Sequence, residues 1–508
     1  MSGKYLDTDV ITPKPKGCIK VRYILVAMIF WGFLMEYSLR INLSVALVAM
    51  VNITSTKLDS SNNITECPEN LETFNATHEI YKEDHGQFNW DAEIVGLILG
   101  AVFYGYMFAQ LPACLFIEKF GPKHVFGCGI FFSAVLTFLT PLAASYDFKA
   151  LIALRALEGL FMGVDAAAIH SIWGNWAPKW ERSKLVSCSY SGVNLGMVTA
   201  LPICGLLIEN AGWPSVFYVL GGFTCVWWIG WLFLTSNTPA DHPFISNEER
   251  QYIEESIELT VKPLKTPWKK ILTSRPFLAT INTHFCLNWG FYTLLTCLPL
   301  YMKEVLRFDI QQNSLLSALP YIVQWFVAIM ASFIADFLRE KKYLSTTATR
   351  KLMTAFGSLL PALFLVIINY IGCDKYIAVI MIVLSVGTSS FASSGFFIGI
   401  MEMSPKLSGT LMGISNSIGT ISGILGPYIV GIITKEKGTR QEWKIVFFIS
   451  ATIYVLGCAS YIIFGSAEVQ PWDERDIKTC DDEQILKPKI HKRQKEAHLS
   501  ELNTVEFT

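Results

Sequence analysis

Charged side chains are scarce in this chain of 508 residues. Asp, Glu, Lys and Arg make up 16% of the residues, whereas a soluble globular protein carries about 25%. The 41 Lys and Arg residues nearly balance the 42 Asp and Glu residues, so the basic surplus typical of a nucleic-acid-binding protein is missing. Twelve Cys residues, most of them within apolar runs, form no disulfide framework. A nucleic-acid partner and a disulfide scaffold are therefore excluded.

The sequence also lacks the short motifs of several enzyme classes. It contains no Walker A pattern, so ATP is not expected as an energy source. It contains no HExxH, CxxC or GxSxG pattern, which leaves a hydrolase or a metalloenzyme without support. We therefore expect no enzymatic activity, no metal and no cofactor.

Long apolar runs dominate what is present, and 52% of the residues are hydrophobic. A helix needs about 20 apolar residues to cross a bilayer, and such runs recur along the chain. They exclude a soluble enzyme and a disordered protein, and they predict an all-α membrane protein with twelve transmembrane helices. The expected spans are 23–50, 93–116, 124–146, 149–174, 185–208, 214–236, 276–301, 313–337, 352–372, 377–402, 408–434 and 444–466.

The spans divide into two groups of six. We expect an N-terminal half over 23–236 and a C-terminal half over 276–466, joined by the polar linker 237–275. Ser246 and Glu249 have the spacing of a capping box, which predicts a short helix in that linker. Segments 1–22 and 467–508 form the two tails.

The distribution of Lys and Arg predicts the orientation. With both termini placed in the cytoplasm, the inner segments hold roughly three times as many Lys and Arg residues as the outer loops. The loop 51–92 then lies outside, and it carries glycosylation sequons at Asn63 and Asn75. We therefore expect both termini to be cytoplasmic and this loop to be glycosylated.

The two halves echo each other. Glu118 follows the second span and Asp336 follows the eighth, each with a small residue four positions before it and a basic residue just beyond. We interpret Glu118 and Asp336 as members of equivalent structural charge pairs. Such a repeat is typical of six-helix halves related by a pseudo-two-fold axis.

The first span carries two charges, although each charge in a lipid span costs about 2.5–3.5 kcal/mol on insertion scales. Arg40 has Glu36 four residues before it, which predicts a structural ion pair within the helix. The functional alternative is that Arg40 binds an anionic substrate, because a guanidinium matches a carboxylate or phosphate bidentately.

The fourth span is the richest in charge. On one continuous helix Arg155, Glu158 and Asp165 would share a stripe, with His170 at its edge. Arg155 and Glu158 have the spacing of a structural pair, whereas Asp165 has no base at helical spacing. A buried unpaired carboxyl titrates near neutral pH, so we expect Glu158 and Asp165 to couple protons, with His170 and His284 in support.

Several segments resemble the anion transporters of solute carrier family seventeen, within the major facilitator superfamily. They include Arg40-Ile-Asn-Leu-Ser-Val-Ala-Leu47, Leu154-Arg155-Ala-Leu-Glu158-Gly159, Ile172-Trp-Gly-Asn-Trp-Ala-Pro178 and Leu411-Met-Gly-Ile-Ser-Asn416. The family includes sialin, the vesicular glutamate transporters and the type I sodium-phosphate cotransporters, and the chain resembles sialin among them. The resemblance implies alternating access around a central anion site, for which we expect Arg40, Tyr104, Asn288 and Tyr292 as substrate-binding residues.

The chain departs from the family pattern at functional positions. Leu287 stands where the vesicular glutamate transporters have arginine, Met162 where sialin has a second glutamate, and Glu36 where sialin is apolar. We propose that Asp165, one turn beyond Met162, replaces the missing acid. Cys67 and Cys373 are expected in outside loops, where they form a disulfide or remain two free thiols.

Together these features predict a secondary active transporter of small organic anions driven by proton symport, working as a monomer in the lipid bilayer. The alternative is a sodium-dependent phosphate or organic anion cotransporter. From another class, a sensor or a passive anion channel on the same fold remains open. We expect an integral protein of an endolysosomal, synaptic-vesicle-type or plasma membrane.

Overall fold

A computed structural model describes residues 20–52, 86–110, 112–178, 181–257, 266–371, 374–404, 407–435 and 438–473. Over these residues the chain is helical, and the β-structure is a single isolated bridge between Val51 and Phe88. Within these ranges, ten helical stretches are long and apolar enough to cross a membrane. The fourth span, which is divided, and the seventh span complete twelve.

The N-terminal half contains the first six spans. They are α1 (Val21–Met50), α2 (Ala92–Gln110) with α3 (Ala113–Phe120), α4 (Pro122–Tyr146), α5 (Phe148–Met162) with α6 (Asp165–Trp176), α7 (Arg182–Ala211) and α8 (Pro214–Leu234). Gly121 and Gly212, both with φ near +80°, turn the chain just before the Pro-led starts of α4 and α8.

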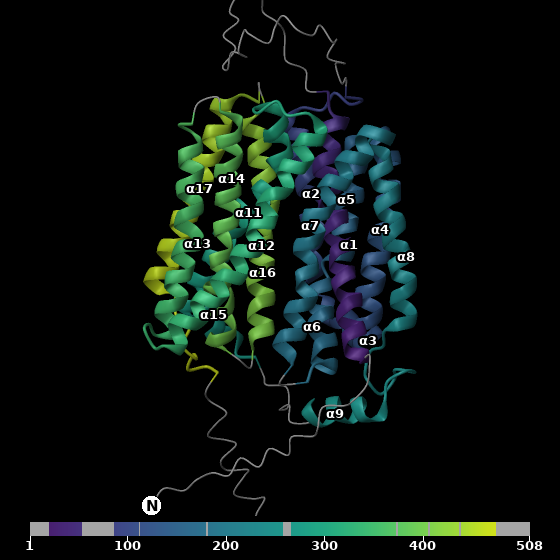
Figure 1. Ribbon diagram of the computed structural model, residues 1–508, viewed down its shortest axis with the longest axis vertical. Helices are drawn as coiled ribbons and strands as arrows, with labels where there is room; N and C mark the ends of the chain where they lie inside the picture. The colour runs from purple at the N-terminus through teal and green to yellow at the C-terminus, as the bar shows by residue number, and fades with distance from the viewer. Residues whose placement is uncertain are drawn as a thin grey trace, which may run out of the picture.

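The C-terminal half follows the linker helices α9 (Asn247–Ile257) and α10 (Trp268–Leu272). Its spans are α11 (Arg275–Glu304), α12 (Ile310–Glu340), α13 (Thr346–Ile368), α14 (Lys375–Ser389) with the 3₁₀ turn η2 (Ser390–Ser394) and α15 (Phe396–Met403), α16 (Ser408–Ile433) and α17 (Arg440–Phe464). The two halves stand side by side, and α9 lies beneath one end of the bundle (Figure 1). We call this the α9 end and the opposite one the far end.

The fourth span differs from the sequence prediction, which expected one continuous helix over 149–174. The helix is interrupted at Gly163 and Val164, and Asp165 becomes the first residue of α6. A Cβ on Gly163 would lie 2.5 Å from the carbonyl oxygen of Tyr106, so α2 crosses very closely at this point. Arg155 and Glu158 therefore belong to a different helix from Asp165 and His170, and the expected continuous helix is interrupted between the two pairs.

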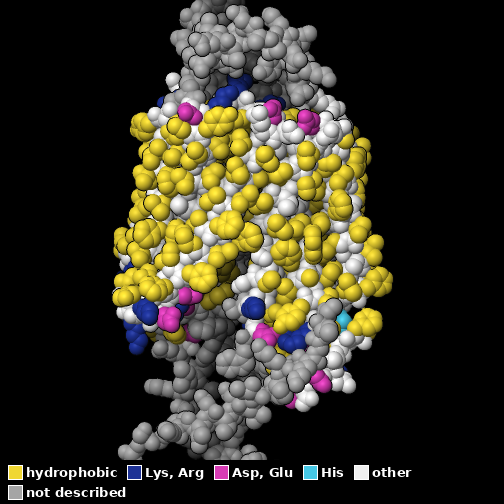
Figure 2. Space-filling model, in the orientation of Figure 1, with side chains coloured by type: hydrophobic (Ala, Val, Ile, Leu, Met, Phe, Trp, Pro, Cys, Tyr) yellow, Lys and Arg dark blue, Asp and Glu magenta, His cyan; other side chains and the backbone are white. Residues whose placement is uncertain are grey.

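The halves meet at the far end. A Cβ on Gly96 of α2 would lie 2.4 Å from the carbonyl oxygen of Pro427 on α16, so these two helices pack backbone to backbone. Lys435 Nζ lies 2.5 Å from Glu93 Oε2 and 3.9 Å from Asp91 Oδ2, across the boundary between the halves. At the α9 end the surface is hollowed between the halves (Figure 2). The described protein is thus closed at the far end and open toward α9.

The linker helix α9 is fixed to the N-terminal half. Ser246 Oγ accepts a hydrogen bond from the backbone N–H of Glu249, as expected for the predicted capping box. The Glu249 carboxylate, however, accepts hydrogen bonds from the backbone N–H of Val21 and from Arg22 Nη1, both at 3.0 Å. Glu249 therefore caps the start of α1 and holds α9 against it.

Candidate functional site

Arg40 lies on α1 at the centre of the bundle and is almost completely buried. Its guanidinium lies between two aromatic rings, with the centroids of Tyr37 and Tyr106 each 4.6 Å away. Nη2 donates to Glu36 Oε1 at 2.9 Å, so the ion pair predicted within the helix is present. Nε has no hydrogen-bond partner among the described residues. Two rings and a carboxylate thus fix the orientation of the Arg40 guanidinium, which still has an unused N–H donor.

Asp165 lies beside Glu36, although 129 positions separate them in the sequence. The two carboxyl groups are within hydrogen-bonding contact. Glu36 Oε2 is buried and meets no donor group among the described residues, and Asp165 Oδ1 accepts from the backbone N–H of Ala166 at 2.5 Å. Because two carboxylates are both acceptors, a hydrogen bond between them requires one shared proton.

Arg155 and Glu158 form a separate network on α5. Arg155 Nη1 lies 2.8 Å from Glu158 Oε2, and Glu158 Oε1 accepts from Thr137 Oγ1 at 2.8 Å. Arg155 Nη2 also donates to the backbone carbonyl of Arg40 at 3.1 Å. Glu158 is therefore fully engaged, and Arg155 ties α5 to the segment of α1 that carries Arg40.

The two candidate histidines have different surroundings. His170, on α6, is exposed and interacts electrostatically with Asp165, and its ring lies 6.2 Å from that of Tyr190. His284, on α11, is buried, and its Nδ1 lies 2.7 Å from Ser415 Oγ on α16. The His170 side chain is thus accessible at the surface of the helix bundle, whereas His284 is held within the C-terminal half.

The C-terminal half contributes one face of α11 to the centre. His284, Asn288 and Tyr292 follow one another at intervals of four residues, which aligns them along that face. The Tyr292 ring packs 4.6 Å from Phe103 of α2, and Tyr292 interacts electrostatically with Arg40. Two expected substrate-binding residues, Arg40 and Tyr292, are therefore brought together from opposite halves.

Tyr104 has a different position from the one expected. It is half-buried on α2 and interacts with Tyr428 of α16, whereas Tyr106, two residues on, contacts Arg40. Sequence reasoning named neither Tyr37 nor Tyr106 as part of the site. The spacing of Tyr37, one turn from Arg40 on the same helix, could have indicated its contact with Arg40. No such local pattern identifies Tyr106, because it lies on a different helix.

The remaining candidates do not join the site. Glu118 and Asp336 are exposed, and neither makes an ion pair among the described residues. In the C-terminal half the buried cation is Arg350, whose Nη2 lies 2.7 Å from Glu402. Other predicted features lie outside the described residues, namely the sequons at Asn63 and Asn75 and the cysteines Cys67 and Cys373.

Comparison with known proteins identifies the family. The family model described as Major Facilitator Superfamily matches residues 26–427. The chain belongs to this superfamily. Sialin from Homo sapiens is 42% identical over 460 residues, which cover 90% of this chain and 92% of sialin. Vesicular glutamate transporter 1 from Bos taurus is 40% identical, covering 93% and 82%.

These relatives confirm the resemblance to solute carrier family seventeen. Membership makes the protein an integral membrane transporter and not an enzyme. Solved structures support the twelve-helix fold at low identity. A bacterial homolog of the human lysosomal transporter Spinster, in an inward-facing and unoccupied conformation, matches with TM-score 0.64 at 13% identity over 90% of this chain and 100% of that one. A D-xylose-proton symporter matches with TM-score 0.62 at 13% identity over 88% and 99%.

Proposed function

We propose that this superfamily member is a secondary active transporter that carries one small organic anion together with one proton. Its similarity to sialin and the vesicular glutamate transporters supports the transport of organic anions. The observation that carries the finer proposal is the central cluster of Arg40, Glu36 and Asp165, in which one buried cation faces two touching carboxyl groups.

Arg40 is the proposed anion site. Its guanidinium remains charged when buried and presents paired donors to a carboxylate. In the described state Glu36 occupies part of that donor edge at 2.9 Å. An incoming carboxylate therefore competes with Glu36 for Arg40. Asn288 and Tyr292 belong to α11 of the C-terminal half and would complete the site. Tyr292 contacts Phe103 of α2, in the N-terminal half.

The carboxyl pair is the proposed proton site. A proton shared by Glu36 and Asp165 weakens the hold of Glu36 on Arg40, because the pair then carries one negative charge instead of two. Arg40 becomes available to the anion, so proton binding and anion binding favour each other. When the proton leaves, the pair regains its second negative charge, Glu36 holds Arg40 more strongly, and the anion is released. This reciprocity is what symport requires.

The supporting residues have positions consistent with this cycle. His170 is exposed on α6, the helix that Asp165 begins, and relays protons between solvent and Asp165. Glu158 stays paired with Arg155 and keeps the backbone at Arg40 in place. His284 lies on the same face of α11 as Asn288 and Tyr292 and supports the substrate site from the C-terminal half.

The decisive experiment uses the purified full chain in liposomes. A panel of organic anions and inorganic phosphate is offered while a proton gradient and a sodium gradient are imposed separately. Concentrative uptake of an organic anion driven by the proton gradient alone is the expected result. Uptake that follows sodium would identify a sodium-dependent cotransporter. Uptake that never exceeds equilibrium would identify a passive channel, and no flux of any anion would leave a sensor.

A further inference from the structure

Two hydrogen bonds join the halves where α2 ends. Gln110, the last residue of α2, accepts from Ser417 Oγ at 2.7 Å and donates through Nε2 to Thr420 Oγ1 at 3.3 Å, both on α16. We call these three residues the Gln110 clasp. Tyr106, which contacts Arg40, lies one turn before Gln110 on α2. The clasp therefore fastens the halves about 5 Å closer to the α9 end than the level of Tyr106.

The clasp lies on one of two seams that the internal repeat relates. We call them the α2–α16 seam and the α7–α12 seam, because each pairs one helix of either half. At the far end Gly96 of α2 packs on the backbone of α16, and a Cβ on Gly205 of α7 would lie 2.5 Å from Ser314 Oγ of α12. The shift from Gly96 to Ser314 is 218 positions, the same as from Glu118 to Asp336. The far ends of the two seams are therefore equivalent.

The equivalence ends at the clasp. The shift of 218 positions takes Gln110 to Ala328 of α12. Between α7 and α16 the far-end contacts correspond at a shift of 222 positions, which takes Ser417 to Leu195 of α7. Ala and Leu side chains have no hydrogen-bonding atoms. The α7–α12 seam therefore carries no counterpart of the Gln110 clasp at these positions.

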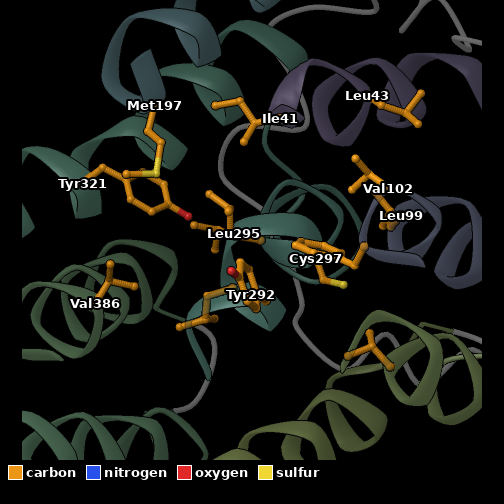
Figure 3. Close-up of a cluster of buried hydrophobic side chains, with 14 of the residues drawn as sticks. Ile41, Leu43, Leu99, Val102, Met197, Tyr292, Leu295, Cys297, Tyr321 and Val386 are labelled. Carbon is orange, nitrogen blue, oxygen red and sulfur yellow. The ribbon is translucent and has the colours of Figure 1, made fainter. Parts of the chain in front are cut away.

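Apolar packing takes its place on the α7–α12 seam. In Figure 3 Met197 of α7 lies beside the ring of Tyr321 of α12, which is buried. A Met side chain has three rotatable bonds and adapts its packing to a moving neighbour. The clasp, in contrast, consists of hydrogen bonds, which weaken steeply when their geometry changes. One seam is thus able to slide and the other is fixed in one register.

The backbone also changes beside the clasp. α2 ends at Gln110, and the second span resumes as α3 at Ala113, directly after Pro112. The equivalent span of the C-terminal half, α12, is one helix of 31 residues. A break between two helical segments lets one tilt relative to the other, whereas a continuous helix moves as a rod. The second span therefore has a joint at the residue that joins α2 to α16.

We infer that the Gln110 clasp is a hinge of the transporter. α2 and α16 stay joined there in both states of alternating access, while the far end opens and the α7–α12 seam moves. The described state is closed at the far end and hollowed at the α9 end (Figure 2). To face the other side, the far-end contacts of Gly96 and Lys435 separate and the halves approach at the α9 end. The clasp lies on the α9 side of α2, where this motion brings the halves together.

The strength of the clasp suits this role. Two neutral hydrogen bonds favour the joined arrangement by about fivefold to a hundredfold. That preference keeps α2 and α16 together during a cycle and is lost when the amide is removed. The inference concerns the conformational change of a superfamily member, so it does not depend on which anion or which ion is carried.

The test measures distances between pairs of nitroxide labels by double electron–electron resonance. The full chain, with its native cysteines replaced by serine, is studied in liposomes at pH 5 and at pH 7.4 without added anion. One pair lies beside the clasp, one spans the α7–α12 seam toward α9, and one spans the far end. All six label sites are exposed side chains, and the pairs are Phe108→Cys with Ile418→Cys, Ser187→Cys with Phe326→Cys, and Glu209→Cys with Tyr376→Cys.

We expect the far-end pair and the α7–α12 pair each to show two distances, whose populations change together with pH. The pair beside the clasp should show one distance at both pH values. Gln110→Leu keeps the size of the side chain but loses both hydrogen bonds, so this pair should then show a second, longer distance. Ser417→Ala removes one of the two bonds and should act in the same direction. Gln312→Leu, at an exposed glutamine of α12, is the matched control and should change nothing.

The other outcomes overturn the hinge. If the pair beside the clasp shows two distances in the parent protein, α2 and α16 separate during the cycle. If this pair keeps one distance in both Gln110→Leu and Ser417→Ala, the seam is held by packing and not by the clasp. If none of the three pairs shows a second distance, no motion turns about Gln110.

Discussion

The clearest prediction concerns the number of protons carried in each cycle. The Glu36–Asp165 pair has one place for a shared proton, and Glu158 is already neutralised by Arg155 at 2.8 Å. One proton should therefore cross with each monovalent anion, and the cycle should move no net charge. One pH unit corresponds to about 1.4 kcal/mol. A gradient of one unit should then support about tenfold accumulation, and two units about a hundredfold.

The assay is steady-state uptake into liposomes that contain the purified protein, with the membrane voltage clamped by potassium and valinomycin. Accumulation should follow the pH gradient and ignore the voltage. The amide of Asp165→Asn cannot bind and release a proton. Gradient-driven accumulation should therefore fall to about onefold. Exchange of internal for external anion needs no net proton movement and should persist. Glu118→Gln, at an exposed acid on α3, is the matched control.

Three results would refute this reasoning. Accumulation that changes with the clamped voltage, or that reaches about a hundredfold at one pH unit, would require a second proton and would return Glu158 to the coupling step. If Asp165→Asn still concentrates the anion, the shared pair is not the proton site. If exchange is also lost, Asp165 belongs to the anion site or is structural.

Three further predictions follow from the ion pairs. Arg40→Lys keeps the charge but loses the guanidinium fork, so transport should fall at least tenfold while the amount of folded protein in the membrane is unchanged; wild-type transport would favour the structural ion pair. Glu249→Ala removes one of two carboxylates from the buried Arg22, and should lower the free energy of unfolding in detergent by about 3 kcal/mol; a change within error would show that α9 is loosely held. Lys435→Glu should alter the transport rate by only about twofold, because exposed pairs contribute little; adding Glu93→Lys should restore the rate, and a failure to do so would mean that the pair does not hold the halves together.

The spans, the division into halves and the superfamily could all be predicted from sequence. Apolar runs long enough to cross a bilayer are a local property, and each run becomes a helix because lipid offers no partner for its backbone. The candidate charges were found for the same reason. Arg40, Glu158 and Asp165 stand out because a charge inside such a run is costly and needs a role or a partner. Their helical spacing also predicted the two intrahelical pairs, since residues three or four apart lie on the same face of a helix.

The tertiary structure decided which charges meet across helices. Periodicity gives the face of a helix but not the helix opposite, so the contact of Glu36 with Asp165 could not be read from the sequence. The close crossing of α2 at Gly163 accompanies the interruption of the fourth span, which places Asp165 on a different helix from Arg155.

The same limit applies to the tyrosines. Tyr104 and Tyr106 lie on different faces of an apolar helix, and only the packing of α2 against α1 places Tyr106 on Arg40. The sequence by itself therefore determined which helices form and which charges need explaining. The packing of those helices determined the partners, because contacts between residues far apart in the chain depend on how whole helices fit together.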